Sequence, residues 1–132
     1  MAKITRITMT HFQYELTDMG QEETLGFDRV YRAGSCLPLN GSILTIETDI
    51  GISGQVPGGV DGHAARYLLG RDPFQRERIW HDLKRARRGR DGTPPGSVDI
   101  ALWDMAGKLY DVPIYRLLGG WRKKLPAYAS TY

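Results

Sequence analysis

Hydrophobic and polar residues alternate along the first part of the chain with the two-residue period of β-strands. This alternation changes phase near Thr10 and His11, which predicts a bulge or a bend at that point. The clearest strand places Leu44, Ile46 and Thr48 on one face. Strands are predicted in four places, namely residues 4–16, 30–31, 42–48 and 52–55.

After residue 59 the hydrophobic residues recur with the 3.6-residue period of helices. A short helix is predicted over residues 64–69 and ends at Gly70. A second helix is predicted to begin at residues 72–75, because Asp72 can cap it and Pro73 suits its first position.

The longest apolar segment begins at Ser97, which can cap a helix. The main apolar stripe of this helix consists of Val98, Leu102, Met105 and Leu109. Ile100 and Trp103 extend the apolar surface almost all round, so we expect the helix to be buried against something large. On the remaining polar strip, Asp104 and Lys108 have the spacing of an i,i+4 ion pair.

The last part of the chain predicts a short helix that starts at Pro113 and ends at Gly119, followed by a strand over residues 125–132. A run of strands is therefore followed by a run of helices. This order indicates the α+β class, with an antiparallel β-meander of about three strands followed by a helical bundle.

Composition excludes several classes of protein. The chain has 132 residues, of which 41% are hydrophobic and 25% charged, as in ordinary globular proteins. It contains no apolar run of bilayer length and does not open like a signal peptide. A single cysteine excludes an internal disulfide and fits a reducing compartment, so we expect a cytoplasmic protein. The net charge of +3 neither requires nor excludes an anionic partner.

Some residues suggest chemistry that simpler interpretations explain better. The basic residues 84–90 lie at a helix C-terminus, where cations complement the helix dipole, and no aromatic residues interleave with them for base stacking. We therefore expect no binding to nucleic acid. The three histidines are too dispersed for a metal site. Asp99 and Asp104 diverge on a helix, which favours capping and ion pairing over catalysis, and Cys36 is expected to be a small buried or loop thiol.

Five segments in this order resemble the N-terminal capping domain of the enolase superfamily, in its mandelate racemase/muconate lactonizing enzyme branch. They are DIGISG (49–54), LGRDP (69–73), VDIALWDMAGK (98–108), PIYRLLGG (113–120) and LPAYAST (125–131). The last resembles the first strand of the barrel that follows in the family. In the central segment, the combination of residues 101–104 with Gly107 and Lys108 is specific to the family, although no single piece of it is. Gly107 lies inside a helix, where glycine is unfavourable, which indicates close packing of a neighbouring backbone.

The resemblance implies that residues 1–122 form a capping domain and that residues 123–132 begin a (β/α) barrel. In the family, the general base and the carboxylates that hold Mg²⁺ lie on later barrel strands. We therefore assign no catalytic residue and no metal ligand, and expect the 132-residue chain to be inactive alone. The implied reaction is proton abstraction next to the carboxylate of a small substrate. Dehydration of a sugar acid is the first hypothesis, beside racemisation or epimerisation and cycloisomerisation.

The resemblance also implies that two loops of this domain close over the substrate. The candidate residues in these loops are Thr17, Asp18, Met19, Ser53 and Gln55. For Met19 and Gln55, simple exposure to solvent is an equal alternative. The family often has an aromatic residue, Gly and Glu after the turn, whereas this chain has Gln55, Val56 and Pro57. Relatives with an acidic residue there are therefore poor guides to the substrate.

An alternative from another class is a stand-alone binding module that has no barrel. In that case the apolar helix would be buried in a homo-oligomer. The enzyme hypothesis also predicts a homo-oligomer, with the barrel of the same protein as the partner of this domain, and no association with a membrane.

Overall fold

The computed structural model describes residues 1–17, 34, 36–86 and 96–128. Its elements in chain order are β1 (Ile4–Thr17), β2 (Cys36–Thr48), β3 (Ser53–Pro57), α1 (Gly62–Leu68), α2 (Arg76–Ala86), α3 (Gly96–Tyr110) and α4 (Ile114–Leu117). The chain divides into two compact units. The first unit comprises Met1–Thr10 and Ser42–Trp121, and the second comprises His11–Gly41 and Arg122–Tyr132.

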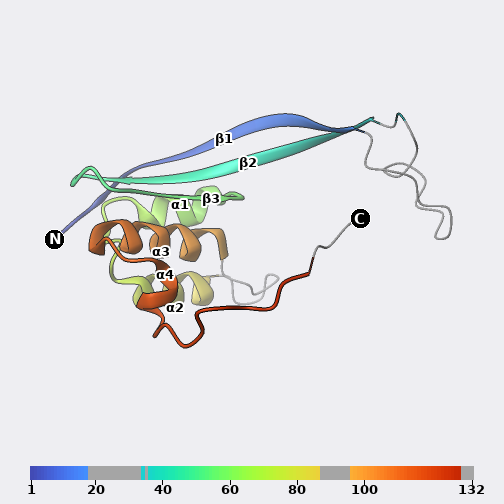
Figure 1. Ribbon diagram of the computed structural model, residues 1–132. Helices are drawn as coiled ribbons and strands as arrows, with labels where there is room; N and C mark the ends of the chain where they lie inside the picture. The colour runs from blue at the N-terminus through green and yellow to red at the C-terminus, as the bar shows by residue number, and fades with distance from the viewer. Residues whose placement is uncertain (18–33, 35, 87–95, 129–132) are drawn as a thin grey trace. The chain divides into compact units, whose positions relative to one another are not determined.

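The strands form one antiparallel sheet in the order β1-β2-β3, which confirms the predicted meander (Figure 1). β2 begins six residues earlier than predicted, and β3 covers Ser53–Pro57. β1 continues through Thr10 and His11 as one strand. The change of phase at that point coincides with the division between the two units. The strand predicted at 30–31 lies outside the described residues.

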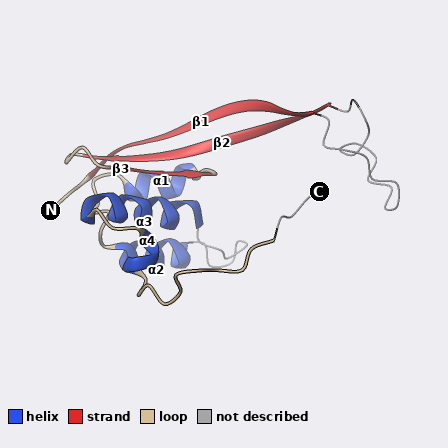
Figure 2. Ribbon diagram, viewed as in Figure 1, coloured by secondary structure: helices blue, strands red, loops and turns tan. Residues whose placement is uncertain are grey.

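The predicted faces of β2 are confirmed. Leu44 and Ile46 are fully buried and Thr48 nearly so, whereas Ile43, which points to the opposite face just before Leu44, is exposed. Thr48 is satisfied in the core because its hydroxyl donates a hydrogen bond to the carbonyl of Ile52 at 2.6 Å. Within the first unit the helices lie on one side of the sheet, and the hydrophobic core fills the space between them (Figure 2).

α1 confirms the first predicted helix and begins with a cap that the sequence analysis missed. The Asp61 carboxylate accepts hydrogen bonds from the amides of His63 and Ala64 at 2.9 and 2.8 Å. Gly70 follows the helix with a φ of 79°, which suits its role as a stop. α2 begins at Arg76 rather than at residue 72. Asp72 instead accepts from the amide of Phe74, so it caps a separate turn before the helix.

α3 is buried on one side within the first unit, and part of the apolar surface that was expected to be buried against something large is exposed. Its buried residues are Val98, Ala101, Leu102, Met105 and Ala106. Leu109, placed on the main stripe, is 38% exposed because it lies in the last turn, and Ile100 is 52% exposed. The helix begins at Gly96, so Ser97 lies in its first turn rather than at its cap.

The end of the chain agrees with the predictions only in part. Pro113 precedes α4, and Gly119 follows it with a φ of 99°, as expected. Residues 125–128 form no strand in the structure, because a strand needs a hydrogen-bonded neighbour and none pairs with this described segment. Among the described residues, no helix has the length and apolar character required to cross a bilayer.

The backbone of β3 approaches the backbone of α3 closely at Gly54. A Cβ atom built on Gly54 would lie 1.9 Å from the carbonyl oxygen of Ala101 and 2.8 Å from its carbon. Only a residue without a side chain lets the strand approach the helix backbone so closely. The predicted close packing at Gly107 is also confirmed, since a Cβ there would lie 3.1 Å from the carbonyl oxygen of Val112.

We predict that Gly54→Ala lowers the free energy of unfolding by about 3 kcal/mol or more, because the backbones of β3 and α3 must separate. Chemical denaturation followed by far-UV circular dichroism measures this change. Gly62→Ala is the control, since nothing lies within 4 Å of the added methyl group. It should change stability by less than about 1 kcal/mol. Equal effects of the two substitutions would contradict the steric argument.

A hydrogen bond joins α1 to α2. The Tyr67 hydroxyl donates to the Asp82 carboxylate at 2.5 Å. This hydrogen bond is the main cause that lowers the pKa of Asp82, with Arg78 nearby adding to it. Burial, followed by the same hydrogen bond, raises the pKa of Tyr67. Ionised Asp82 therefore stabilises the fold at pH values above the ordinary pKa of an aspartate. This stabilisation is lost as the pH falls through the lowered pKa of Asp82 in the folded chain.

We predict that Tyr67→Phe makes the stability of the chain less sensitive to acid. Wild type should lose more stability than the variant between about pH 5 and about pH 2, because only wild type must protonate a hydrogen-bonded Asp82. Urea titrations at several pH values measure the difference. Tyr14→Phe, at an exposed tyrosine of β1, should follow wild type. Parallel acid profiles of Tyr67→Phe and wild type would exclude the hydrogen bond as the cause.

Candidate functional site

The predicted closure residues lie in different parts of the structure. Ser53 and Gln55 both lie on β3 in the first unit. Thr17 is the exposed last residue of β1 and belongs to the second unit. Asp18 and Met19 lie outside the described residues. The structure therefore brings together only Ser53 and Gln55.

The segment that carries Ser53 and Gln55 is the strand predicted over residues 52–55, so these two residues do not lie in a loop as the resemblance implied. β3 pairs antiparallel with β2, with Gln55 opposite Thr45 and Ser53 opposite Glu47. Because Gly54 between them faces the carbonyl of Ala101, the side chains of Ser53 and Gln55 lie on the opposite face, away from the helices. The Gln55 side-chain amide donates to the Thr45 hydroxyl at 3.3 Å.

The outer edge of β3 is covered by an ion pair from α3. The Asp104 carboxylate accepts from the backbone amide of Gln55 at 2.9 Å. The Lys108 ammonium donates to the carbonyl oxygen of Ser53 at 2.9 Å and to Asp104 at 2.7 Å. The i,i+4 pair predicted from sequence is thus confirmed, and it also satisfies backbone groups of an edge strand that β2 leaves unpaired. This β3 edge, with Ser53, Gln55, Asp104 and Lys108, is the candidate site.

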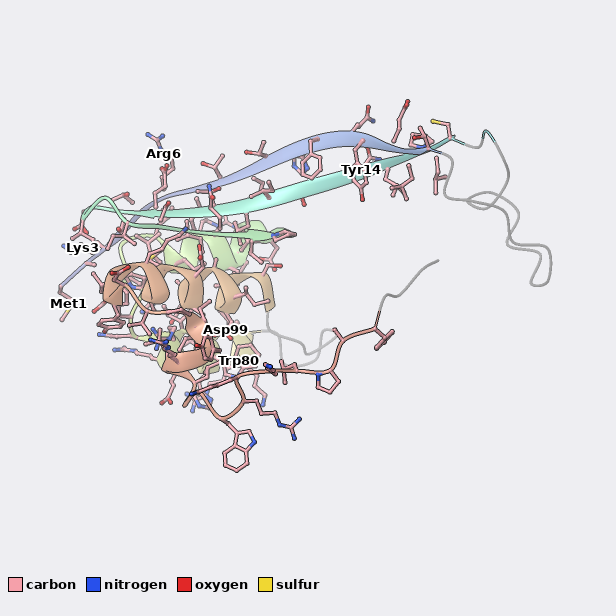
Figure 3. All side chains as sticks on the ribbon, in the orientation of Figure 1. Met1, Lys3, Arg6, Tyr14, Trp80 and Asp99 are labelled. Atoms are coloured by element: carbon pink, nitrogen blue, oxygen red, sulfur yellow. The ribbon has the colours of Figure 1, made fainter. Side chains whose placement is uncertain are left out.

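A second feature is a hollow of about 790 Å³ between α2 and α3. Its lining includes Phe74, Arg76, Trp80, His81, Asp99 and Trp103. The Arg76 guanidinium lies 4.0 Å from the centre of the Trp103 ring, a cation–π arrangement. Burial raises the pKa of Asp99, and the charge of Arg76 opposes this rise. Figure 3 labels Trp80 and Asp99 on the helical side of the molecule. The sequence analysis missed this hollow, because it depends on the packing of two helices.

The described residues do not provide a site for Mg²⁺. Nowhere in residues 1–17, 34, 36–86 and 96–128 do three or more His, Cys, Asp or Glu side chains gather closely enough to hold a metal ion. Asp104, the carboxylate at the β3 edge, is already paired with Lys108. We therefore derive no catalytic step through a metal in this part of the chain.

Cys36 is exposed and begins β2, so it is neither the buried nor the loop thiol that the sequence analysis expected. Partial desolvation, followed by the hydrogen bond to Glu15, raises the pKa of the thiol. A raised pKa keeps a thiol protonated and unreactive at neutral pH, which agrees with a non-catalytic role.

Solved structures share this arrangement of sheet and helices. An enolase-superfamily member from Polaromonas sp. JS666 matches the fold with a TM-score of 0.70 at 24% identity, over 97% of this chain and 36% of that one. D-glucarate dehydratase from Agrobacterium tumefaciens, complexed with magnesium, matches with a TM-score of 0.68 at 29% identity, over 91% of this chain and 33% of that one. The fold is that of the N-terminal domain of enolase-superfamily proteins.

Residues 42–119 match the family model of the mandelate racemase/muconate lactonizing enzyme N-terminal domain. The chain therefore belongs to the mandelate racemase/muconate lactonizing enzyme family. It is 39% identical to a D-galactonate dehydratase of Pectobacterium atrosepticum over 108 residues, which are 70% of this chain and 28% of the relative. A D-galactarolactone cycloisomerase of Agrobacterium fabrum is 46% identical over 70 residues, 48% of this chain and 18% of the relative. The chain thus spans about a quarter of the relatives it matches.

We predict that Asp104→Asn and Lys108→Met are energetically coupled. Each single substitution should lower the stability by about 1 kcal/mol, because it leaves backbone groups of β3 without a partner. A double-mutant cycle measured by urea denaturation should give a coupling of about 0.5–1 kcal/mol. The exposed Arg6–Glu47 pair, 3.3 Å apart, is the matched control and should give less than about 0.5 kcal/mol. A coupling no larger than that of the control would show that Asp104 and Lys108 do not act as a unit.

Proposed function

We propose that this chain is the substrate-closing domain of a Mg²⁺-dependent enzyme that abstracts a proton next to the carboxylate of a sugar acid. The observation that carries the proposal is the match of residues 42–119 to the family's N-terminal domain. The relatives that support the substrate class are a D-galactonate dehydratase and a D-galactarolactone cycloisomerase, both named for sugar-acid or lactone substrates. Dehydration is the preferred outcome of the reaction, with racemisation, epimerisation and cycloisomerisation as the other members of the class.

The metal and the general base of this proposal come from outside the described residues. A bound Mg²⁺ would stabilise the enediolate that forms when the proton leaves, and a magnesium complex of D-glucarate dehydratase supports its presence. The residues of this chain would instead exclude water and select the substrate. We assign these roles to Thr17, Asp18, Met19, Ser53 and Gln55.

The β3 edge supports a positioning role for two of these residues. Asp104 and Lys108 hydrogen-bond to the backbone of Gln55 and Ser53, respectively. The backbone from which the Gln55 side chain extends is therefore held in place. A primary amide can donate to a hydroxyl or carboxylate oxygen and accept from a hydroxyl, which are the groups of a sugar acid. Because this backbone is already ordered, less conformational entropy is lost when the Gln55 amide binds a substrate oxygen.

The remaining partners follow from the same proposal. The domain would act on the barrel of its own protein, in the cytoplasm, within a homo-oligomer and without nucleic acid. The alternative of a stand-alone oligomerising module gains no support from the matched relatives, which are named as enzymes.

The test is an assay of the intact protein encoded by the reading frame that contains this chain. With Mg²⁺, we expect it to exchange the C2 proton of a sugar acid such as D-galactonate for deuterium, or to dehydrate the acid, as followed by NMR. EDTA should abolish the reaction, and residues 1–132 alone should show none. Gln55→Ala should raise KM several-fold, whereas Gln13→Ala, at an exposed glutamine of β1, should not. Turnover by the isolated chain would refute the proposal, as would an intact protein inert toward a panel of sugar acids.

A further inference from the structure

A hydrogen bond to a sulfur atom joins two parts of the first unit that the sheet keeps apart. β2 lies between β1 and β3, so these two strands are not neighbours. The backbone amide of Val60, which follows β3, nevertheless donates to the Sδ atom of Met9 on β1 at 3.4 Å. Val60 lies in the segment between the end of β3 and the start of α1, and we call residues 58–61 the β3–α1 connection.

The β3–α1 connection has two anchors of different chemistry. At Gly58 the anchor is Ser42 of β2, whose carbonyl accepts from the Gly58 amide at 2.8 Å and whose hydroxyl donates to the Gly58 carbonyl at 2.9 Å. At Val60 the anchor is the thioether of Met9. Gly59 lets the sulfur come close, because a Cβ atom there would lie 3.1 Å from Sδ. The second anchor therefore depends on a single sulfur atom.

That sulfur is a group that oxidants can change. A thioether is a weak hydrogen-bond acceptor, and peroxides convert it to a sulfoxide, which is polar and chiral. Met9 is 43% exposed, so a small oxidant can reach it, whereas Met105 in the core is fully buried. The anchor at Gly58 contains only oxygen and nitrogen groups, which peroxides leave unchanged.

The reaction with hydrogen peroxide is an oxygen-atom transfer. A lone pair of the Met9 sulfur attacks one peroxide oxygen, so that an S–O bond forms and the O–O bond breaks. The departing hydroxide takes the proton from the transferred oxygen and leaves as water. Sulfur loses two electrons and peroxide gains them. The new oxygen draws electron density from sulfur and prefers water as its neighbour, so the sulfur becomes a poorer acceptor for the Val60 amide.

We propose that Met9 is an oxidation-sensitive latch on the β3–α1 connection, and that a peroxide weakens substrate binding by opening it. The second half rests on the proposed function, in which Gln55 contacts the substrate. The connection begins three residues after Gln55 on the same run of backbone. With the latch closed, residues 58–61 are held at both anchors. With Met9 oxidised, they are held through Gly58 alone and sample more conformations, so binding the substrate costs more conformational entropy.

Hydrogen–deuterium exchange of the intact protein tests the latch. Treatment with hydrogen peroxide should convert Met9 to its sulfoxide, as mass spectrometry of the peptide shows, and should speed exchange at the Val60 amide by about tenfold. The Gly58 amide is the internal control and should change by less than about twofold, because Ser42 still holds it. Met9→Leu keeps a similar apolar volume without sulfur. Exchange at Val60 should be fast in this variant before treatment and should not respond to peroxide.

Cys36→Ser separates oxidation of the exposed thiol from oxidation of Met9. This variant should keep the full response of the Val60 amide, and a methionine sulfoxide reductase with a dithiol should reverse that response. Unchanged exchange at Val60 in protein that carries the Met9 sulfoxide would overturn the latch. So would a Met9 that stays reduced while the buried Met105 is oxidised, and so would a response that Cys36→Ser abolishes.

Steady-state kinetics with a sugar acid test the effect on binding. Peroxide should raise KM several-fold in wild type and leave kcat nearly unchanged, because the connection carries no reacting group, and Met9→Leu should remove this response. Faster exchange at Val60 in an intact protein without Mg²⁺-dependent activity would support the latch while the proposed function fails. Faster exchange in an active protein whose KM does not change would overturn the link between the latch and substrate binding, and would leave the proposed function in place.

Discussion

The contact between Gly54 and Ala101 is the constraint on which the rest of the first unit depends. Because Gly54 has no side chain, β3 lies directly against the backbone of α3. This short distance brings Asp104 and Lys108 within hydrogen-bonding reach of the strand edge. Gly54 pairs with Ile46 of β2, which is buried in the core together with Leu44. A wider separation would leave both the edge and the core without their partners.

The same contact determines which surfaces of α3 remain for function. One flank is used by β3, and the inner side is used by the core. Trp103 lies on the remaining side, where the Arg76 guanidinium stacks on its ring. The candidate site therefore combines the edge of β3 with one flank of α3.

Several features of the site could be predicted from the sequence, since they depend on residues close together in the chain. The i,i+4 spacing of Asp104 and Lys108 predicted their ion pair, and the alternation at Leu44 and Ile46 predicted the buried face of β2. Asp61 was within reach of the same reasoning, because Asp before a helical pattern is a common cap. The role of Lys108 at Ser53 was not, because 55 residues separate them.

The local sequence pattern determined the class of the fold, because strands with a two-residue hydrophobic period precede helices with a 3.6-residue period. Each period matches the geometry of one backbone conformation, strand or helix. It also contained the residues that resemble the family, and the family match confirmed them. Tertiary structure alone decided that α3 covers the outer edge of β3, that α2 starts after a separate turn, and that α3 leaves Ile100 exposed. The physical reason is that hydrogen-bond partners and buried area are properties of the whole packed unit. A segment read in isolation does not contain the neighbour that will pair with it or cover it.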